Sequence, residues 1–95
     1  MDECRQNQPS IVEIKVIESR CDLMPKGSIL MLEGPCINYQ KSGPVCVTAL
    51  NAIYPWVMAT RFGVRAEALD YDFQNNCYKA SCPCGTVFFE MRKLQ

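Results

Sequence analysis

Two stretches in the first third of the chain have the hydrophobic pattern of β-strands. Between residues 11 and 18, Val12, Ile14 and Val16 alternate with charged residues, which is the period of a strand with one buried face. Residues 28–33 are more continuously apolar and predict a second strand. Pro25 and Gly27 lie between the two stretches and favour a turn there.

The middle of the chain has the period of a helix, from about Val45 to Phe62. One side of that helix is apolar, at positions Leu50, Ile53, Tyr54, Val57 and Met58. Pro55 interrupts the pattern, because proline removes a backbone hydrogen bond in a helix interior. We therefore expect one kinked helix or two short helices, ending at Gly63 as the C-terminal cap. Residues 64–69 predict one further helical turn.

The last part of the chain predicts a β-hairpin, with strands at 77–82 and 86–92 and a tight turn between them. The order β-β-α-β-β indicates an α+β fold, a small antiparallel sheet with the helix or helices packed on one face. Residues 36–44 are rich in turn formers and predict a loop. We expect residues 1–9 to be a flexible N-terminal tail and residues 10–95 to be a single domain.

Composition and charge narrow the class of protein. The 95 residues are 48% hydrophobic and 21% charged, which is ordinary for a globular domain. Ten basic residues balance ten acidic ones without a basic patch, so nucleic acid is not an expected partner. The long uncharged run at 42–60 contains two prolines, and no membrane insertion is expected. The polar N-terminus does not resemble a secretory signal, which predicts a cytoplasmic protein.

The chain has no histidine, and this excludes several kinds of site. Ser-His-Asp and Cys-His catalysis have no base, and mixed Cys/His zinc sites lack a ligand. The chain does have seven cysteines. In a reducing cytosol they are expected to be thiols or metal ligands rather than disulfides.

The hairpin cysteines are the first candidates for a metal site. Cys82 and Cys84 flank the turn, and Cys46, Cys21 or Cys77 would complete the four thiolates that zinc or an iron–sulfur cluster requires. No Cys-x-x-Cys pair is present, and the alternative is that these residues pack as small buried hydrophobes.

Cys46 is a separate, weak candidate for a catalytic nucleophile. We place it in the first helical turn, where the helix dipole would lower its pKa. No base for it is evident, and the alternative is that its thiol faces the core.

Several segments together resemble a family of small, cysteine-containing proteins of about this length from anaerobic bacteria and archaea, which has no assigned function. The resemblance rests on residues 12–18, 45–50, 52–55, 61–63 and 87–90. It matches cysteines to Cys21, Cys46 and Cys82. The family's Gly-His near the second strand is replaced here by residues 24–27 without histidine. The resemblance implies a thiol-rich, anaerobic cytosol, where iron–sulfur chemistry is common.

Three hypotheses for function follow. The first is a small accessory or redox-linked protein that binds a metal or iron–sulfur cluster through the clustered cysteines. The second is a non-catalytic interaction module, or small subunit of a larger assembly, with a protein partner or as a homo-oligomer. The third is a thiol-dependent enzyme that uses Cys46.

Overall fold

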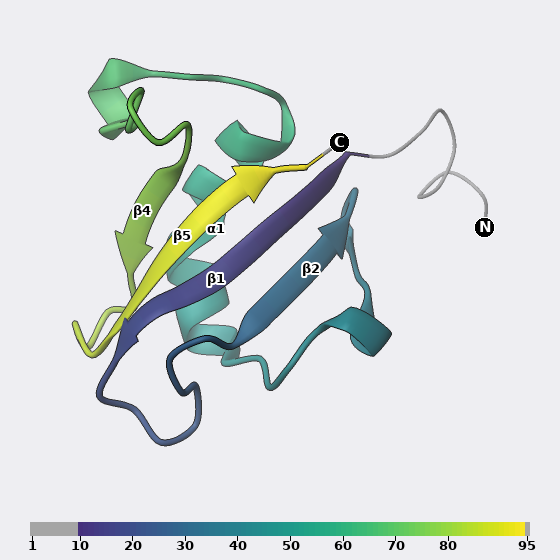
Figure 1. The fold of residues 1–95 in the computed structure, drawn as a ribbon, viewed down its shortest axis with the longest axis vertical. Helices are drawn as coiled ribbons and strands as arrows, with labels where there is room; N and C mark the ends of the chain where they lie inside the picture. The colour runs from purple at the N-terminus through teal and green to yellow at the C-terminus, as the bar shows by residue number, and fades with distance from the viewer. Residues whose placement is uncertain (1–9, 95) are drawn as a thin grey trace.

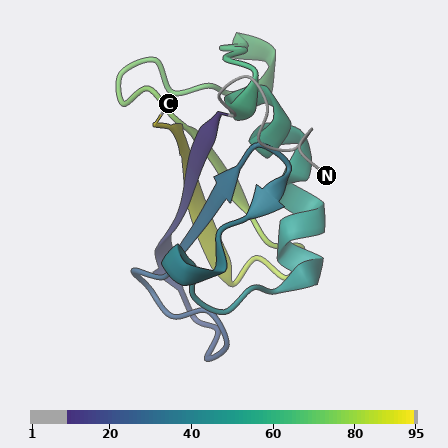
Figure 2. The ribbon, with the colours of Figure 1, turned by 90° about the vertical axis from the view of Figure 1, so that its right-hand side faces the viewer.

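Five strands form one antiparallel sheet, and one α-helix covers one of its faces (Figures 1 and 2). The computed structural model describes residues 10–94, so Cys4 and the predicted tail 1–9 lie outside the described residues. The elements in chain order are β1 (Ile11–Ser19), β2 (Ile29–Glu33), β3 (Cys36–Ile37), η2 (Tyr39–Lys41), α1 (Val47–Arg61), η3 (Glu67–Leu69), β4 (Tyr78–Ser81) and β5 (Val87–Lys93). The predicted α+β fold is confirmed, and β3 is an addition to it.

The strand predicted first lies at the centre of the sheet. The strand order is β3-β2-β1-β5-β4, so β1 pairs with both β2 and β5. Ile14 stands opposite Leu30 on one side and opposite Met91 on the other. All three side chains are buried, because every second residue of each strand points toward α1. The alternating residues of β1 therefore carry the core, and the charged ones face away from the helix.

Side chains from the predicted 36–44 loop close one edge of the sheet. Asn38 accepts backbone N–H bonds from Gln40 and Lys41 and so begins the short 3-10 helix η2. The turn that follows brings Ser42 beside β2, where its hydroxyl oxygen accepts the Met31 N–H at 2.9 Å. An edge strand with satisfied backbone groups is a poor template for pairing with another chain.

The predicted helix is one continuous element that contains Pro55. The chain therefore forms a single helix here and not two short ones. Its buried side is Ala49, Ile53, Val57 and Thr60. Gly63 follows it with a φ of 72°, and its N–H donates to the Thr60 carbonyl. This is the glycine cap expected from the sequence. Within residues 10–94, no helix combines the length and the apolar character that crossing a membrane requires.

Tyr78 joins the segment after α1 to the sheet. The side chain is fully buried, and its hydroxyl donates to the Val64 carbonyl and accepts the Ala66 N–H at 2.9 Å. The Tyr71 ring meets it edge-on, with 4.7 Å between centroids. The further helical turn expected at 64–69 is present as η3, and Tyr78 holds the chain that leads into it.

We expect Tyr78→Phe to lower the free energy of unfolding by about 1–3 kcal/mol, because it leaves a buried N–H and a carbonyl without their partner. Urea unfolding followed by circular dichroism measures this. Tyr71→Phe is the matched control, since its hydroxyl has no hydrogen bond within residues 10–94, and we expect a change below about 0.5 kcal/mol. Equal effects of the two variants would contradict the role given to the Tyr78 hydroxyl.

Candidate functional site

The turn between β4 and β5 contains two cysteines, Cys82 and Cys84, two positions apart. The Gly85 N–H donates to the Cys82 carbonyl at 2.9 Å and closes the turn. Pro83 suits the second place of such a turn, and Gly85 adopts a φ of 70°, which favours glycine. Cα atoms two residues apart in a closed turn are within the range that a disulfide spans. Cys82 and Cys84 are therefore a candidate dithiol.

Thr86 and the turn backbone shape the environment of the Cys82 thiol. The side chain is 8% exposed, and its Sγ lies 3.5 Å from the Thr86 hydroxyl oxygen. Burial alone would raise the pKa of Cys82. Hydrogen bonds from the Thr86 hydroxyl and from backbone N–H groups of the turn outweigh it and lower that pKa to about 7. A substantial fraction of Cys82 is thus thiolate at neutral pH.

Cys84 has the opposite character, because its side chain is exposed at the tip of the same turn. An accessible thiol beside a buried thiolate is the arrangement in which one cysteine meets a partner and the other completes the exchange. Both residues were predicted from the sequence as metal ligands, whereas Thr86 was not predicted as part of a site. Thr86 could have been predicted from its position, because its hydroxyl follows Cys84 by two residues, where the chain returns from a tight turn.

Cys21 lies at the same end of the sheet as the hairpin turn. It follows β1, and the N–H of its neighbour Arg20 donates to the Thr86 carbonyl at 2.8 Å. Its side chain is partly buried and packs against the core. Cys21 thus directly follows the residue whose backbone bonds to Thr86, the threonine that contacts Cys82.

Cys46 precedes α1 instead of lying in its first turn. It is the N-cap residue, and its side chain makes no capping hydrogen bond. The thiol is partly buried and lines a small apolar space with Met24 and Leu30. This placement corresponds to the alternative in which Cys46 faces the core, and catalysis by Cys46 remains an untested prediction.

Cys77 stands at the far end of β4 from Cys82. The two are five positions apart along an extended chain, or about 16 Å at roughly 3.3 Å per residue. Cys77 is 1% exposed, and its burial, together with the nearby Glu90, raises the pKa of its thiol. Among residues 10–94, no group of three or more cysteine or acidic side chains is placed to hold a metal ion. Zinc or cluster binding therefore has no complete ligand set in the described chain and stays a prediction.

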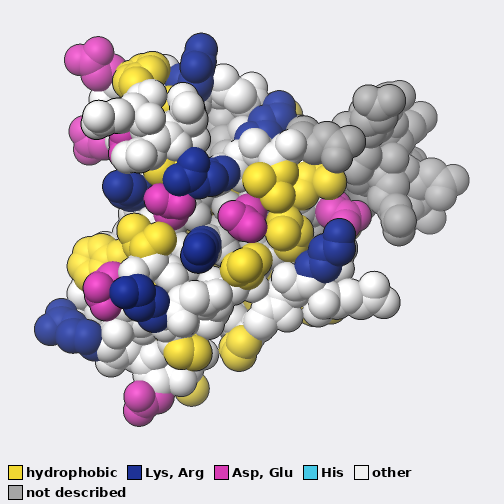
Figure 3. Space-filling view, viewed as in Figure 1, with side chains coloured by type: hydrophobic (Ala, Val, Ile, Leu, Met, Phe, Trp, Pro, Cys, Tyr) yellow, Lys and Arg dark blue, Asp and Glu magenta, His cyan; other side chains and the backbone are white. Residues whose placement is uncertain are grey.

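The sheet face that α1 does not cover carries charged side chains on β1, β4 and β5, with hydrophobic ones beside them. Lys15 and Lys79 stand opposite Glu90, one on each side of β5, and Glu13 stands opposite Arg92. Figure 3 shows basic side chains (dark blue) and acidic side chains (magenta) mixed across the middle of this face. The arrangement is a solvated surface of alternating charge, with opposite charges side by side.

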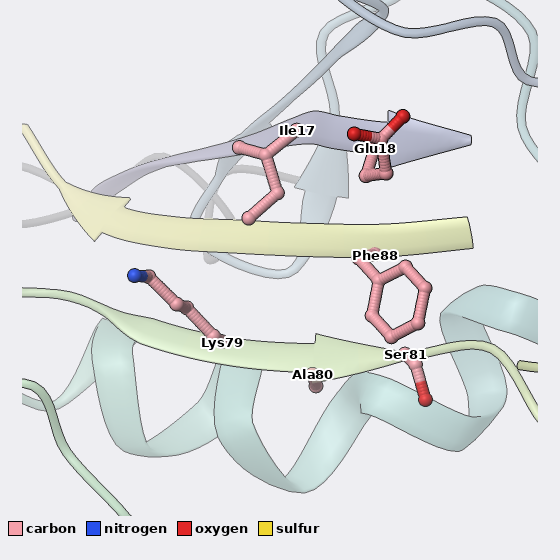
Figure 4. A pocket seen from close by; sticks show the side chains of 6 residues that line it. All are labelled: Ile17, Glu18, Lys79, Ala80, Ser81 and Phe88. Atoms are coloured by element: carbon pink, nitrogen blue, oxygen red, sulfur yellow. The ribbon is translucent and has the colours of Figure 1, made fainter.

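A shallow hollow of about 500 Å³ interrupts this charged face beside the hairpin. Its lining residues are labelled in Figure 4 and are Ile17, Glu18, Lys79, Ala80, Ser81 and Phe88. The Phe88 ring lies between β5 and β4 beside Ser81, its cross-strand partner. Because side chains alternate along β4, Ser81 points to this face and Cys82 to the helix side. The hollow and the Cys82 thiol thus lie on opposite faces of the sheet.

Comparisons with protein-family models, with curated proteins and with solved structures find no significant match to this chain. The resemblance to the anaerobe family therefore remains a prediction. A proposal for function has to rest on the geometry of the candidate site.

We expect Thr86→Val to raise the pKa of Cys82 from about 7 toward the ordinary cysteine value, because the thiolate loses its hydroxyl donor while valine keeps the side-chain volume. The pH dependence of alkylation at Cys82, followed by mass spectrometry of its peptide, measures this. Thr48→Val, at an exposed position near the start of α1, is the matched control and should leave the profile unchanged. An unshifted profile in Thr86→Val would show that the hydroxyl does not stabilise the thiolate.

Proposed function

We propose that this protein is a small redox-linked accessory protein whose working group is the Cys82–Cys84 dithiol. The observation that carries the proposal is the presence, in one closed turn, of an exposed thiol and of a buried one whose Sγ lies 3.5 Å from the Thr86 hydroxyl oxygen. The charged sheet face and the packing of Cys46 offer no comparable constellation within the described chain. In this proposal, the redox role expected from the sequence belongs to two of the candidate cysteines, Cys82 and Cys84.

The chemistry is thiol–disulfide exchange with a partner that carries a disulfide. The Cys84 thiolate attacks the partner disulfide, forms a mixed disulfide and releases the first partner thiolate. The Cys82 thiolate then attacks the Cys84 sulfur, forms the Cys82–Cys84 disulfide and releases the second. Two protein thiols lose two electrons and two protons, and one partner disulfide becomes two thiols. The low pKa of Cys82 suits the second step, since the thiolate is the nucleophile.

A metal-binding function is the second candidate, because the same turn supplies two adjacent sulfurs. Zinc and iron–sulfur sites take four ligands, and one hairpin provides half of them. The described residues of one chain do not fit a complete site. A second copy of the chain would have to contribute the other pair, which makes metal binding and homo-oligomer formation one hypothesis.

Equilibration of the reduced protein with graded mixtures of reduced and oxidised glutathione tests the redox proposal. We expect the first two-electron oxidation to join Cys82 to Cys84, seen by peptide mass spectrometry as a loss of two hydrogens. In Cys82→Ser, a mixed disulfide with glutathione should persist on Cys84, because the resolving thiol is absent.

The control for this experiment is Cys36→Ser, which changes another exposed cysteine and should leave the oxidation unaltered. Oxidation that pairs Cys84 with another cysteine, or that begins elsewhere in the chain, would reject the dithiol as the working group.

For the metal hypothesis, we expect iron, sulfide or zinc in protein purified without oxygen to elute only with a dimer, at one site per two chains. Size-exclusion chromatography with metal and sulfide analysis of each fraction measures this, and Cys82→Ser/Cys84→Ser should abolish it. One metal site in a monomeric fraction, or metal retained by the double variant, would contradict the shared-site hypothesis.

A further inference from the structure

A second hollow, of about 340 Å³, lies at the opposite end of the sheet from the cysteine turn. It is bounded by the C-terminal end of α1, the segment after it, the loop before β4 and the end of β5. Its lining residues are Thr60, Gly63, Val64, Arg65, Tyr71, Asn76, Met91 and Lys93. We call it the distal hollow.

Among residues 10–94, two cations and no acidic side chain line the distal hollow. Within residues 10–94 the ion pairs are Lys79–Asp72 and Arg92–Glu90, so neither Arg65 nor Lys93 has an ionic partner there. The Lys93 Nζ lies 3.9 Å from where a Cβ on Gly63 would be, which places the ammonium at the wall of the hollow. The hollow therefore has a positive charge that nothing in the described chain neutralises.

The helix end beside the hollow does not account for these cations. The last carbonyls of α1 accept backbone bonds, from Gly63 to Thr60 at 3.1 Å and from Val64 to Ala59 at 2.9 Å. The carbonyls that a capping lysine would serve are thus occupied by the glycine cap itself. The Lys93 charge can still interact favourably with the helix dipole, but this interaction affects the stability of the fold and not ligand binding.

Uncommitted hydrogen-bond donors accompany the charge. Within residues 10–94, neither the Asn76 side-chain amide nor the Tyr71 hydroxyl makes a hydrogen bond, although both residues line the hollow. The buried Met91 and the half-exposed Val64 contribute apolar surface. A hollow with two free cations, two free polar groups and an apolar wall is complementary to an anion that has a small hydrocarbon body.

We propose that the distal hollow binds a small anion through a carboxylate or phosphate group. Arg65 and Lys93 supply the charge, Asn76 and Tyr71 donate hydrogen bonds, and Val64 and Met91 contact the apolar part of the ligand. This site is independent of the cysteine turn and of the redox function proposed above.

Two probes separate the anion chemistries, inorganic phosphate and butyrate, each titrated at constant ionic strength and followed by ¹⁵N–¹H NMR. We expect saturable shifts at Arg65, Asn76 and their neighbours with at least one probe, and the probe that saturates identifies the group. Arg65→Ala/Lys93→Met should weaken that binding by roughly 10-fold or more, since two charge-assisted contacts are lost. Raising the salt concentration should also weaken it.

Lys26→Met/Lys41→Met is the matched control, because it removes the same net charge at two exposed positions away from the hollow. The control should bind as the wild type does. Absence of saturable shifts with both probes would overturn the proposal. It would also be overturned if the Arg65/Lys93 variant kept the wild-type affinity, or if the control lost as much affinity as that variant. Urea unfolding of each variant confirms that binding is compared between folded proteins.

Discussion

The register of β1 against its two neighbours is the constraint on which the rest of this structure depends. Ile14 faces Leu30 and Met91 at once, so one residue fixes the alignment of three strands. A slip of one position would turn the buried side chains to solvent and the charged ones toward α1. With a single helix covering one face, no other layer compensates for such an error. The alternation in β1 therefore decides which side chains of β4 and β5 reach the core.

The low pKa of Cys82 is a consequence of that register. β5 is held so that Phe89 and Val87 point to the core, and Cys82 follows β4 on the same side of the sheet. The turn then returns Thr86 to within 3.5 Å of the buried sulfur. Burial on its own would keep the thiol protonated, as it does for Cys77. The hydrogen-bond donors of the tight turn lower the pKa of Cys82, whereas burial and the nearby Glu90 raise that of Cys77.

Periodicity predicted β1, β2, the final hairpin and α1, because each buries one face against a common core. It did not predict β3, because the two residues of that strand are too few to carry a periodic signal. The position of Cys21 at the same end of the sheet as the hairpin turn was also beyond it, since that position follows from the pairing of β1 with β5. The separation of Cys77 from Cys82 was predictable, because five positions along an extended strand hold two sulfurs far apart. The candidate dithiol was visible in the sequence, whereas the Thr86 contact that distinguishes its two members required the fold.

The two candidate sites lie at opposite ends of one sheet, and this limits how they can interact. α1 has fifteen residues, a length of about 22 Å at 1.5 Å per residue, and it begins beside Cys46 and ends at the distal hollow. β5 begins beside Cys82 and ends at Lys93, a span of roughly 20 Å at about 3.3 Å per residue. A bound anion at Arg65 and Lys93 is therefore too far from Cys82 to change its pKa appreciably through a screened charge, since that span exceeds two Debye lengths at physiological salt. The direct connection is β5, which begins one residue after Thr86 and ends at Lys93. Because β5 is paired on both sides, a displacement at one end would have to break the register that stabilises the core. The two sites are thus expected to act independently, and the thiol chemistry should not respond to the anion.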